Sequence, residues 1–127
     1  RHTVQAETIA TAIRIGDPAS WDRAVRAIRE TNGMVISFTD DEIVDAKVAI
    51  DAAGVGCEPA SAASVAGVKQ LVRDGIINAG DRVVAVLTGH VLKDPGMLVE
   101  LHQQRPDFAK ANRPIEIDAS VQAVADV

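Results

Sequence analysis

Three residues that could contact a ligand follow directly after an apolar run in the second half of the chain. Thr88, Gly89 and His90 come after Arg82–Leu87, a run typical of a strand covered on both faces. Ligands of open α/β sheets sit beyond the carboxyl ends of strands. A threonine hydroxyl can exchange a hydrogen bond with a ring nitrogen without adding charge, and glycine lets the backbone approach a flat ligand. The turn therefore predicts either a polar binding site or a strand end whose hydroxyl bonds its own loop.

A second candidate segment, Gly56–Ala63, combines a glutamate with small residues. Glu58 precedes a helix that begins at Pro59, where a negative charge interacts favourably with the helix dipole. The small residues Ala60 and Ser61 would let a cofactor or a neighbouring helix approach closely. Taken alone, the segment favours tight helix packing with a cap over a binding wall.

Covalent chemistry through a lysine is not indicated. An amine that forms a Schiff base is usually desolvated or lies beside another cation, so that its pKa falls. Lys93 instead adjoins Asp94, which would stabilise the charged ammonium. The other lysines, Lys47, Lys69 and Lys110, are predicted on helix surfaces. The chain also contains no nucleophile elbow, no phosphate-binding lysine loop and no dinucleotide fingerprint.

The composition argues against several other classes of function. A net charge of −5 over 127 residues does not suit nucleic acids or anionic membranes, which call for a basic patch. No apolar run approaches the ~20 residues of a membrane span. The single cysteine, Cys57, rules out an internal disulfide and indicates a reducing, cytoplasmic location. Because His2, His90 and His102 lack metal-ligand spacing, no metal site is predicted.

Helices and short apolar runs alternate along the chain. Caps and apolar periodicity predict helices within Gly16–Gly33, Thr39–Gly54 and Glu58–Gly75, from Asp94 to about Gln104, and from Asp118 onward. Asp17 or Ser20 would cap the first helix, and Thr39 with Glu42 forms a capping box for the second. The expected buried faces are Trp21, Ala24, Val25 and Ile28 in the first helix, and Ile43, Ala46, Ala49 and Ile50 in the second.

Strands are expected at Met34–Phe38 and Arg82–Leu87, with a last short one at Pro114–Ile117. The alternation predicts an α/β fold, a partial three-layer sandwich whose small, mostly parallel sheet is flanked by helices. A parallel sheet usually has several strands and both faces covered by helices. A sheet of only two or three strands would therefore need a second copy of the chain or the rest of a larger protein as its partner. We expect a single domain over residues 1–127, with a poorly ordered segment at 1–15 and a tail at 96–127.

Three segments together resemble a known family. Glu7–Trp21, Cys57–Gly67 and Val86–Pro95, in this order and spacing, are similar to the C-terminal portion of threonine synthase. That family uses pyridoxal 5′-phosphate on the fold type II scaffold of the tryptophan synthase β family. The resemblance implies an enzyme that converts O-phosphohomoserine and water into threonine and phosphate, with the cofactor as electron sink.

The resemblance also assigns roles to individual residues. It implies that Thr88 hydrogen-bonds the pyridine nitrogen, that Glu58 lies close to the cofactor ring, and that Gly89 completes the cofactor contacts. Ala60, Ser61 and His90 would line the pocket wall. The family's Schiff-base lysine and its phosphate loop belong to an N-terminal half that this sequence lacks, so no catalytic residue is expected here. Lys93 would then be structural, and the chain alone would be inactive and would not bind the cofactor.

Alternatives remain open at this point. The family commonly has glycine where this chain has Val91, and a valine with positive φ would be strained. A fragment of a related threonine or serine dehydratase, or a free-standing ligand-binding or regulatory module, would also fit. The expected partners are the missing N-terminal part, the substrate O-phosphohomoserine and a second copy of the chain. The polar residues from Arg1 onward do not look like the beginning of a structural element, and this favours a fragment of a longer protein.

Overall fold

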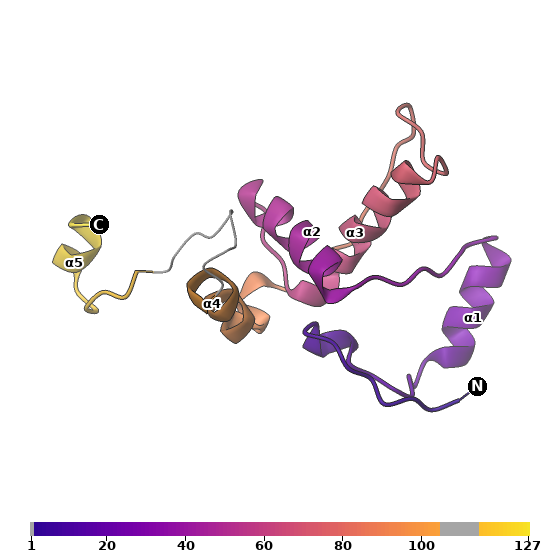
Figure 1. Ribbon diagram of the computed structural model, residues 1–127, viewed down its shortest axis with the longest axis horizontal. Helices are drawn as coiled ribbons and strands as arrows, with labels where there is room; N and C mark the ends of the chain where they lie inside the picture. The colour runs from indigo at the N-terminus through magenta and orange to yellow at the C-terminus, as the bar shows by residue number, and fades with distance from the viewer. Residues whose placement is uncertain (1, 105–114) are drawn as a thin grey trace. The chain divides into compact units, whose positions relative to one another are not determined.

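A computed structural model describes residues 2–104 and 115–127 of the chain. The chain divides into two compact units, Arg1–Asp94 and Pro95–Val127. The first unit contains the 3₁₀ turn η1 (Thr11–Ile13), the helices α1 (Trp21–Glu30), α2 (Asp40–Ala52) and α3 (Pro59–Arg73), and the 3₁₀ turn η2 (Val91–Lys93) (Figure 1). The second unit contains α4 (Pro95–Gln104) and α5 (Val121–Ala125).

The predicted α/β sheet is wrong for this structure, because the described residues contain no β-strand. The apolar runs Met34–Phe38 and Arg82–Leu87 are irregular, and the described part of the third run, Ile115–Ile117, is irregular as well. Val35 and Val84 are 77% and 87% exposed. A strand needs a neighbouring backbone for its hydrogen-bond ladder, and in the described part of the chain these runs do not supply one to each other.

Helix α2 begins with the predicted capping box. The Thr39 hydroxyl accepts a hydrogen bond from the backbone N–H of Glu42 at 3.3 Å, and the Glu42 carboxylate accepts one from the backbone N–H of Thr39 at 2.9 Å. This reciprocal pair satisfies two amides that the first helical turn leaves without partners. The sequence therefore located this helix start correctly.

The capping box makes the stability of α2 depend on pH. Hydrogen bonds from Thr39 lower the pKa of Glu42 below its ordinary value of 4.5. Because the folded pKa is depressed, this stabilisation is complete above the unfolded pKa and is lost as the pH falls through the folded pKa. We expect urea midpoints measured from pH 7 to pH 3 to fall less in a Glu42→Gln variant than in the parent. An equal decrease of the urea midpoint between pH 7 and pH 3 in the two proteins would contradict this prediction.

Helices α2 and α3 lie side by side and form the core of the first unit (Figure 1). Helix α3 begins at Pro59, as predicted, and its small residues allow close packing against α2. Gly67 of α3 faces the irregular run that precedes α2, because a Cβ at this position would lie 3.4 Å from the Phe38 ring and 3.5 Å from the Ile36 side chain. The buried cluster consists of Ala10, Ile43, Ala46, Ile50, Cys57, Ala62 and Ala66. Three of the four predicted α2 face residues are therefore buried, whereas Ala49 is exposed.

The N-terminal segment is tied to this core. Ala10 is fully buried, and η1 contacts α3. The Thr8 hydroxyl donates a hydrogen bond to Asp40 Oδ1 at 2.6 Å, and the Thr11 hydroxyl donates to Asp94 Oδ2 at 2.7 Å. These contacts join the start of the chain to the first residue of α2 and to the residue that follows η2.

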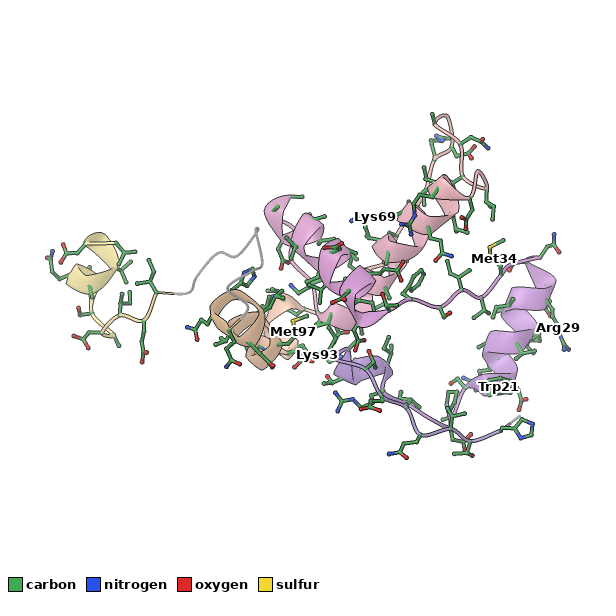
Figure 2. The ribbon with its side chains drawn as sticks, in the orientation of Figure 1. Trp21, Arg29, Met34, Lys69, Lys93 and Met97 are labelled. Atoms are coloured by element: carbon green, nitrogen blue, oxygen red, sulfur yellow. The ribbon has the colours of Figure 1, made fainter. Side chains whose placement is uncertain are left out.

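Helix α1 forms where it was predicted, but its apolar face is not buried. None of its residues is buried, and Trp21 is 39% exposed (Figure 2). The helix begins after Ser20, whose side chain makes no capping hydrogen bond, and it ends before Asn32, which has a φ of +52°. An apolar stripe predicts a face that can be buried, but burial requires an opposing surface within the unit.

The first helix of the second unit lies where the sequence predicted a helix. Helix α4 starts at Pro95, its Leu101 is buried, and its last residue is Gln104. Helix α5 starts at Val121, after an N-cap in which the Ser120 hydroxyl accepts from the N–H of Ala123 at 3.1 Å. Lys110 and Pro114 lie outside the described residues. Among residues 2–104 and 115–127, no helix has the length and apolar character needed to cross a bilayer.

Candidate functional site

The start of α3 and the segment that follows the second apolar run meet at a pair of hydroxyl groups. Ser61 Oγ lies 3.3 Å from Thr88 Oγ1, and the backbone N–H of Gly89 donates to Ser61 Oγ at 2.9 Å. Ser61 is buried whereas Thr88 is exposed, so one hydroxyl lies inside the protein and the other lies at its surface. The two segments that the sequence singled out are thus brought together by direct hydrogen bonds.

The Ser61 hydroxyl shares a hydrogen bond with the Thr88 hydroxyl, and either oxygen can be the donor. Because the Ser61 oxygen accepts from Gly89 and is buried, its own proton needs an acceptor. Within the described part of the chain, the acceptor in reach is Thr88 Oγ1. When Ser61 donates to Thr88, the Thr88 proton is available for a group outside the chain. This arrangement makes Thr88 a neutral hydrogen-bond donor at the protein surface.

Glu58 occupies the space beside Gly89. Its backbone N–H donates to the carbonyl oxygen of Gly89 at 3.0 Å, and its residue exposure is only 4%. A Cβ at position 89 would overlap the carboxyl group of Glu58. The absence of a side chain at this position leaves room for the carboxylate where it lies, and a larger residue would require the Glu58 side chain to move. The carboxylate in turn pairs with the ammonium of Lys93 at 3.1 Å.

The remaining predicted wall residues have mainly local contacts. The His90 ring accepts a hydrogen bond at Nδ1 from the backbone N–H of Leu92 at 3.1 Å, and so caps η2. Ala60 packs against the buried cluster between α2 and α3. Val91 is the first residue of η2 and does not have a positive φ, so the strain considered for valine at this position is absent. Its side chain lies against Gly56, whose φ is +67°.

Lys47 is not on a helix surface, contrary to the sequence prediction. Its side chain is completely buried, and its ammonium lies 2.6 Å from Asp51 Oδ2, one helical turn further along α2. Asp51 Oδ1 is also buried and has no hydrogen-bond partner in the described residues. Lys69 is exposed on α3, as predicted (Figure 2). The prediction for Lys47 failed because this residue lies on the buried side of α2, where Ile43, Val44, Val48 and Ile50 are also buried.

Cys57 directly precedes Glu58 and belongs to the buried cluster of the first unit. The residue is fully buried, and burial raises the pKa of the Cys57 thiol, with Asp51 and Glu58 adding to the rise and Lys47 opposing it. A thiol with a raised pKa remains protonated at neutral pH and is a poor nucleophile. Cys57 is therefore a packing residue of the core and not a reactive group.

Two cavities lie away from this hydroxyl pair. One of about 430 Å³ is lined by Glu42, Asp45, Ala66, Val68, Lys69, Val72 and Arg73. Another of about 420 Å³ is lined by Gln5, Ala6, Glu7, Thr8, Ile9, Arg14 and Asp40. Neither includes Thr88 or Glu58. The candidate site is formed by the converging polar groups at Ser61, Thr88 and Glu58, because an exposed hydroxyl near a buried carboxylate offers specific chemistry that these open hollows do not.

Comparisons with known proteins identify close relatives. The family model described as "Pyridoxal-phosphate dependent enzyme" matches residues 1–89. A threonine synthase of Methanosarcina acetivorans is 43% identical over 121 residues, which cover 94% of this chain and 28% of the relative. A threonine synthase of Synechocystis is 54% identical over 95 residues, which cover 74% of this chain and 24% of the relative. The chain thus spans about a quarter of the length of these two relatives.

Proposed function

The chain belongs to the family of pyridoxal-phosphate dependent enzymes, and we propose that it forms one wall of the cofactor site of a threonine synthase. The resemblance to threonine synthases that Glu7–Trp21, Cys57–Gly67 and Val86–Pro95 predict is confirmed by the relatives. The proposed reaction converts O-phosphohomoserine and water into threonine and phosphate. The observation that carries this proposal is the Ser61–Thr88 hydroxyl pair, which presents a neutral donor beside Gly89.

The described residues fit one edge of a pyridine ring. Thr88 offers a hydroxyl proton at the protein surface, and residue 89 has no side chain that would keep a flat ring at a distance. Pyridoxal phosphate, when bound, supplies an electron sink for carbanion chemistry. A neutral hydroxyl opposite the ring nitrogen leaves that nitrogen uncharged, whereas a carboxylate partner would favour its protonation.

Each residue of the site has a distinct role in this proposal. Thr88 would hold the ring by donating a hydrogen bond from its hydroxyl to the nitrogen, and Ser61 would orient that hydroxyl by donating to its oxygen. Gly89 leaves room for the carboxylate of Glu58 and, through its N–H and C=O groups, connects Ser61 to the N-terminus of α3. Together these contacts fix the ring's position, and binding geometry is what such a wall contributes to catalysis.

The amine that carries the cofactor is proposed to come from outside these 127 residues. Lys47 is buried in a pair with Asp51, Lys93 is paired with Glu58, and Lys69 lies on the exposed side of α3. The phosphate loop and the contacts to O-phosphohomoserine are also assigned to the remainder of the enzyme. The same remainder, or a second copy in a homodimer, would cover the exposed valines of the two apolar runs. The free thiol of Cys57 supports a cytoplasmic location.

Substitution of Thr88 in the intact enzyme tests this function. Thr88→Val removes the donor while it keeps the shape of the side chain, and Thr88→Ser keeps the donor. We expect kcat/KM for phosphate release from O-phosphohomoserine to fall about tenfold to a hundredfold in Thr88→Val, which corresponds to about 1.4–2.7 kcal/mol. We expect Thr88→Ser to stay within about threefold of the parent.

Two outcomes would contradict the proposal. If Thr88→Val had the same kcat/KM and the same cofactor absorption spectrum as the parent enzyme, this hydroxyl would not contact the ring. An intact enzyme that releases ammonia from threonine or serine, but no phosphate from O-phosphohomoserine, would identify the related dehydratase activity instead.

A further inference from the structure

Glu58 is a buried carboxylate with one cationic partner among the described residues. Its side chain is 5% exposed, and the Lys93 ammonium lies 3.1 Å from Glu58 Oε2, while the Lys93 side chain is 58% exposed. A carboxylate that is withdrawn from water needs a compensating charge or several donors. Lys93 supplies this charge and remains partly hydrated itself, so the pair does not require a second buried ion.

Both partners are held by the backbone of the same turn. The Glu58 N–H donates to the Gly89 carbonyl at 3.0 Å, which anchors the residue that carries the carboxylate. The N–H of Lys93 donates to the His90 carbonyl at 3.0 Å within η2, which anchors the residue that carries the ammonium. Figure 2 labels Lys93 on this turn. The ion pair therefore joins the N-terminus of α3 to the segment that carries Thr88.

The carboxylate position depends on this pair. It lies in the space that the missing side chain of Gly89 leaves, beside the residue whose N–H fixes Ser61. Without the ammonium, a carboxylate in this place would be buried and uncompensated, so rotation toward water would be favoured. Such a rotation would leave an empty space beside Gly89 and would loosen the turn that aims the Thr88 hydroxyl.

We propose that Lys93 is a positioning residue, whose ammonium holds the Glu58 carboxylate over Gly89 and thereby fixes the Ser61–Thr88 hydroxyl pair for ring binding. The effect on ring binding rests on the proposed function, whereas the effect on the turn does not. Lys93 does not contact the reacting atoms in this proposal. Its function is electrostatic, and arginine at the same position should replace it.

The test uses the intact enzyme with Lys93→Met and Lys93→Arg. Lys69→Met is the matched control, because Lys69 is exposed on α3 and has no part in the site. Amide hydrogen exchange at Gly89 in the cofactor-free protein reports whether the turn is fixed. We expect exchange to be about tenfold faster in Lys93→Met, and unchanged in Lys93→Arg and Lys69→Met. We expect the dissociation constant for pyridoxal phosphate to rise about tenfold in Lys93→Met alone.

A second variant addresses the charge directly. Glu58→Gln in the Lys93→Met background removes the uncompensated carboxylate, and we expect it to recover most of the slow exchange at Gly89. The proposal would be overturned if the Gly89 amide exchanged in Lys93→Met at the same rate as in the parent. It would also be overturned if exchange in Lys93→Arg were as fast as in Lys93→Met. If the parent enzyme failed to bind pyridoxal phosphate while exchange at Gly89 still depended on Lys93, the proposed function would be wrong. The proposed role of Lys93 in fixing the turn would then still be correct.

Discussion

Asp51→Ala is expected to lower the free energy of unfolding by about 3 kcal/mol, because it leaves the buried ammonium of Lys47 without its counter-ion. The Lys47 side chain is completely buried, so water cannot replace the lost carboxylate without a change in the helix packing. The loss should appear as a lower midpoint in urea unfolding followed by circular dichroism of the intact protein, with an unchanged slope.

Lys47→Met is the matched control for this prediction. It removes the charge instead of its partner and keeps most of the stem volume. The Asp51 side chain is 27% exposed and can reach water by a change of rotamer, although its Oδ1 is buried in the parent. We expect Lys47→Met to change the free energy of unfolding by less than about 1.5 kcal/mol. A double variant that combines Lys47→Met with Asp51→Ala should be more stable than Asp51→Ala alone. If Asp51→Ala were as stable as the parent, Lys47 would not depend on this carboxylate.

Gly89→Ala is expected to reduce both stability and cofactor binding. The new methyl group would overlap the Glu58 carboxyl group, which is enclosed by the protein and paired with Lys93. Overpacking of this kind costs about 1–3 kcal/mol, and here it also displaces the N–H that donates to Ser61. We expect a lower urea midpoint, and a dissociation constant for pyridoxal phosphate at least about tenfold higher in a spectrophotometric titration.

Gly80→Ala is the control for a glycine in an open position, because a Cβ there would meet nothing within 4 Å. We expect its stability and cofactor affinity to match those of the parent. Glu58→Ala combined with Gly89→Ala removes the overlap and should recover part of the lost stability. Equal stability of Gly89→Ala and Gly80→Ala would show that the space beside residue 89 is not restricted.

Features that depend on a few neighbouring residues could be predicted from the sequence. The capping box of Thr39 and Glu42 and the start of α3 at Pro59 were both correct, because the groups that satisfy each other lie within one helical turn. The likeness to threonine synthases also came from short motifs in a fixed order. The proximity of Thr88, Glu58 and Ser61 followed from that likeness and not from spacing alone.

Features that depend on distant partners could not be predicted in this way. Met34–Phe38 and Arg82–Leu87 have the composition of strands, but a strand forms only where another extended backbone lies beside it to share hydrogen bonds. Trp21 and its neighbours on α1 form an apolar stripe, yet no surface buries it in the described structure. Lys47 was assigned to a helix surface, although Asp51, four residues later on the same helix, was a signal for an ion pair.

The enclosure of Cys57 makes its sulfur a reporter of how often the α2–α3 core opens. A protonated, sequestered sulfur reacts with alkylating reagents only during excursions that expose it, since the thiolate is the reactive form. The labelling rate of this one atom therefore measures the frequency of those excursions. Because Glu58 follows it directly in the chain, slower labelling in the presence of pyridoxal phosphate would register ligand occupancy without any assay of turnover.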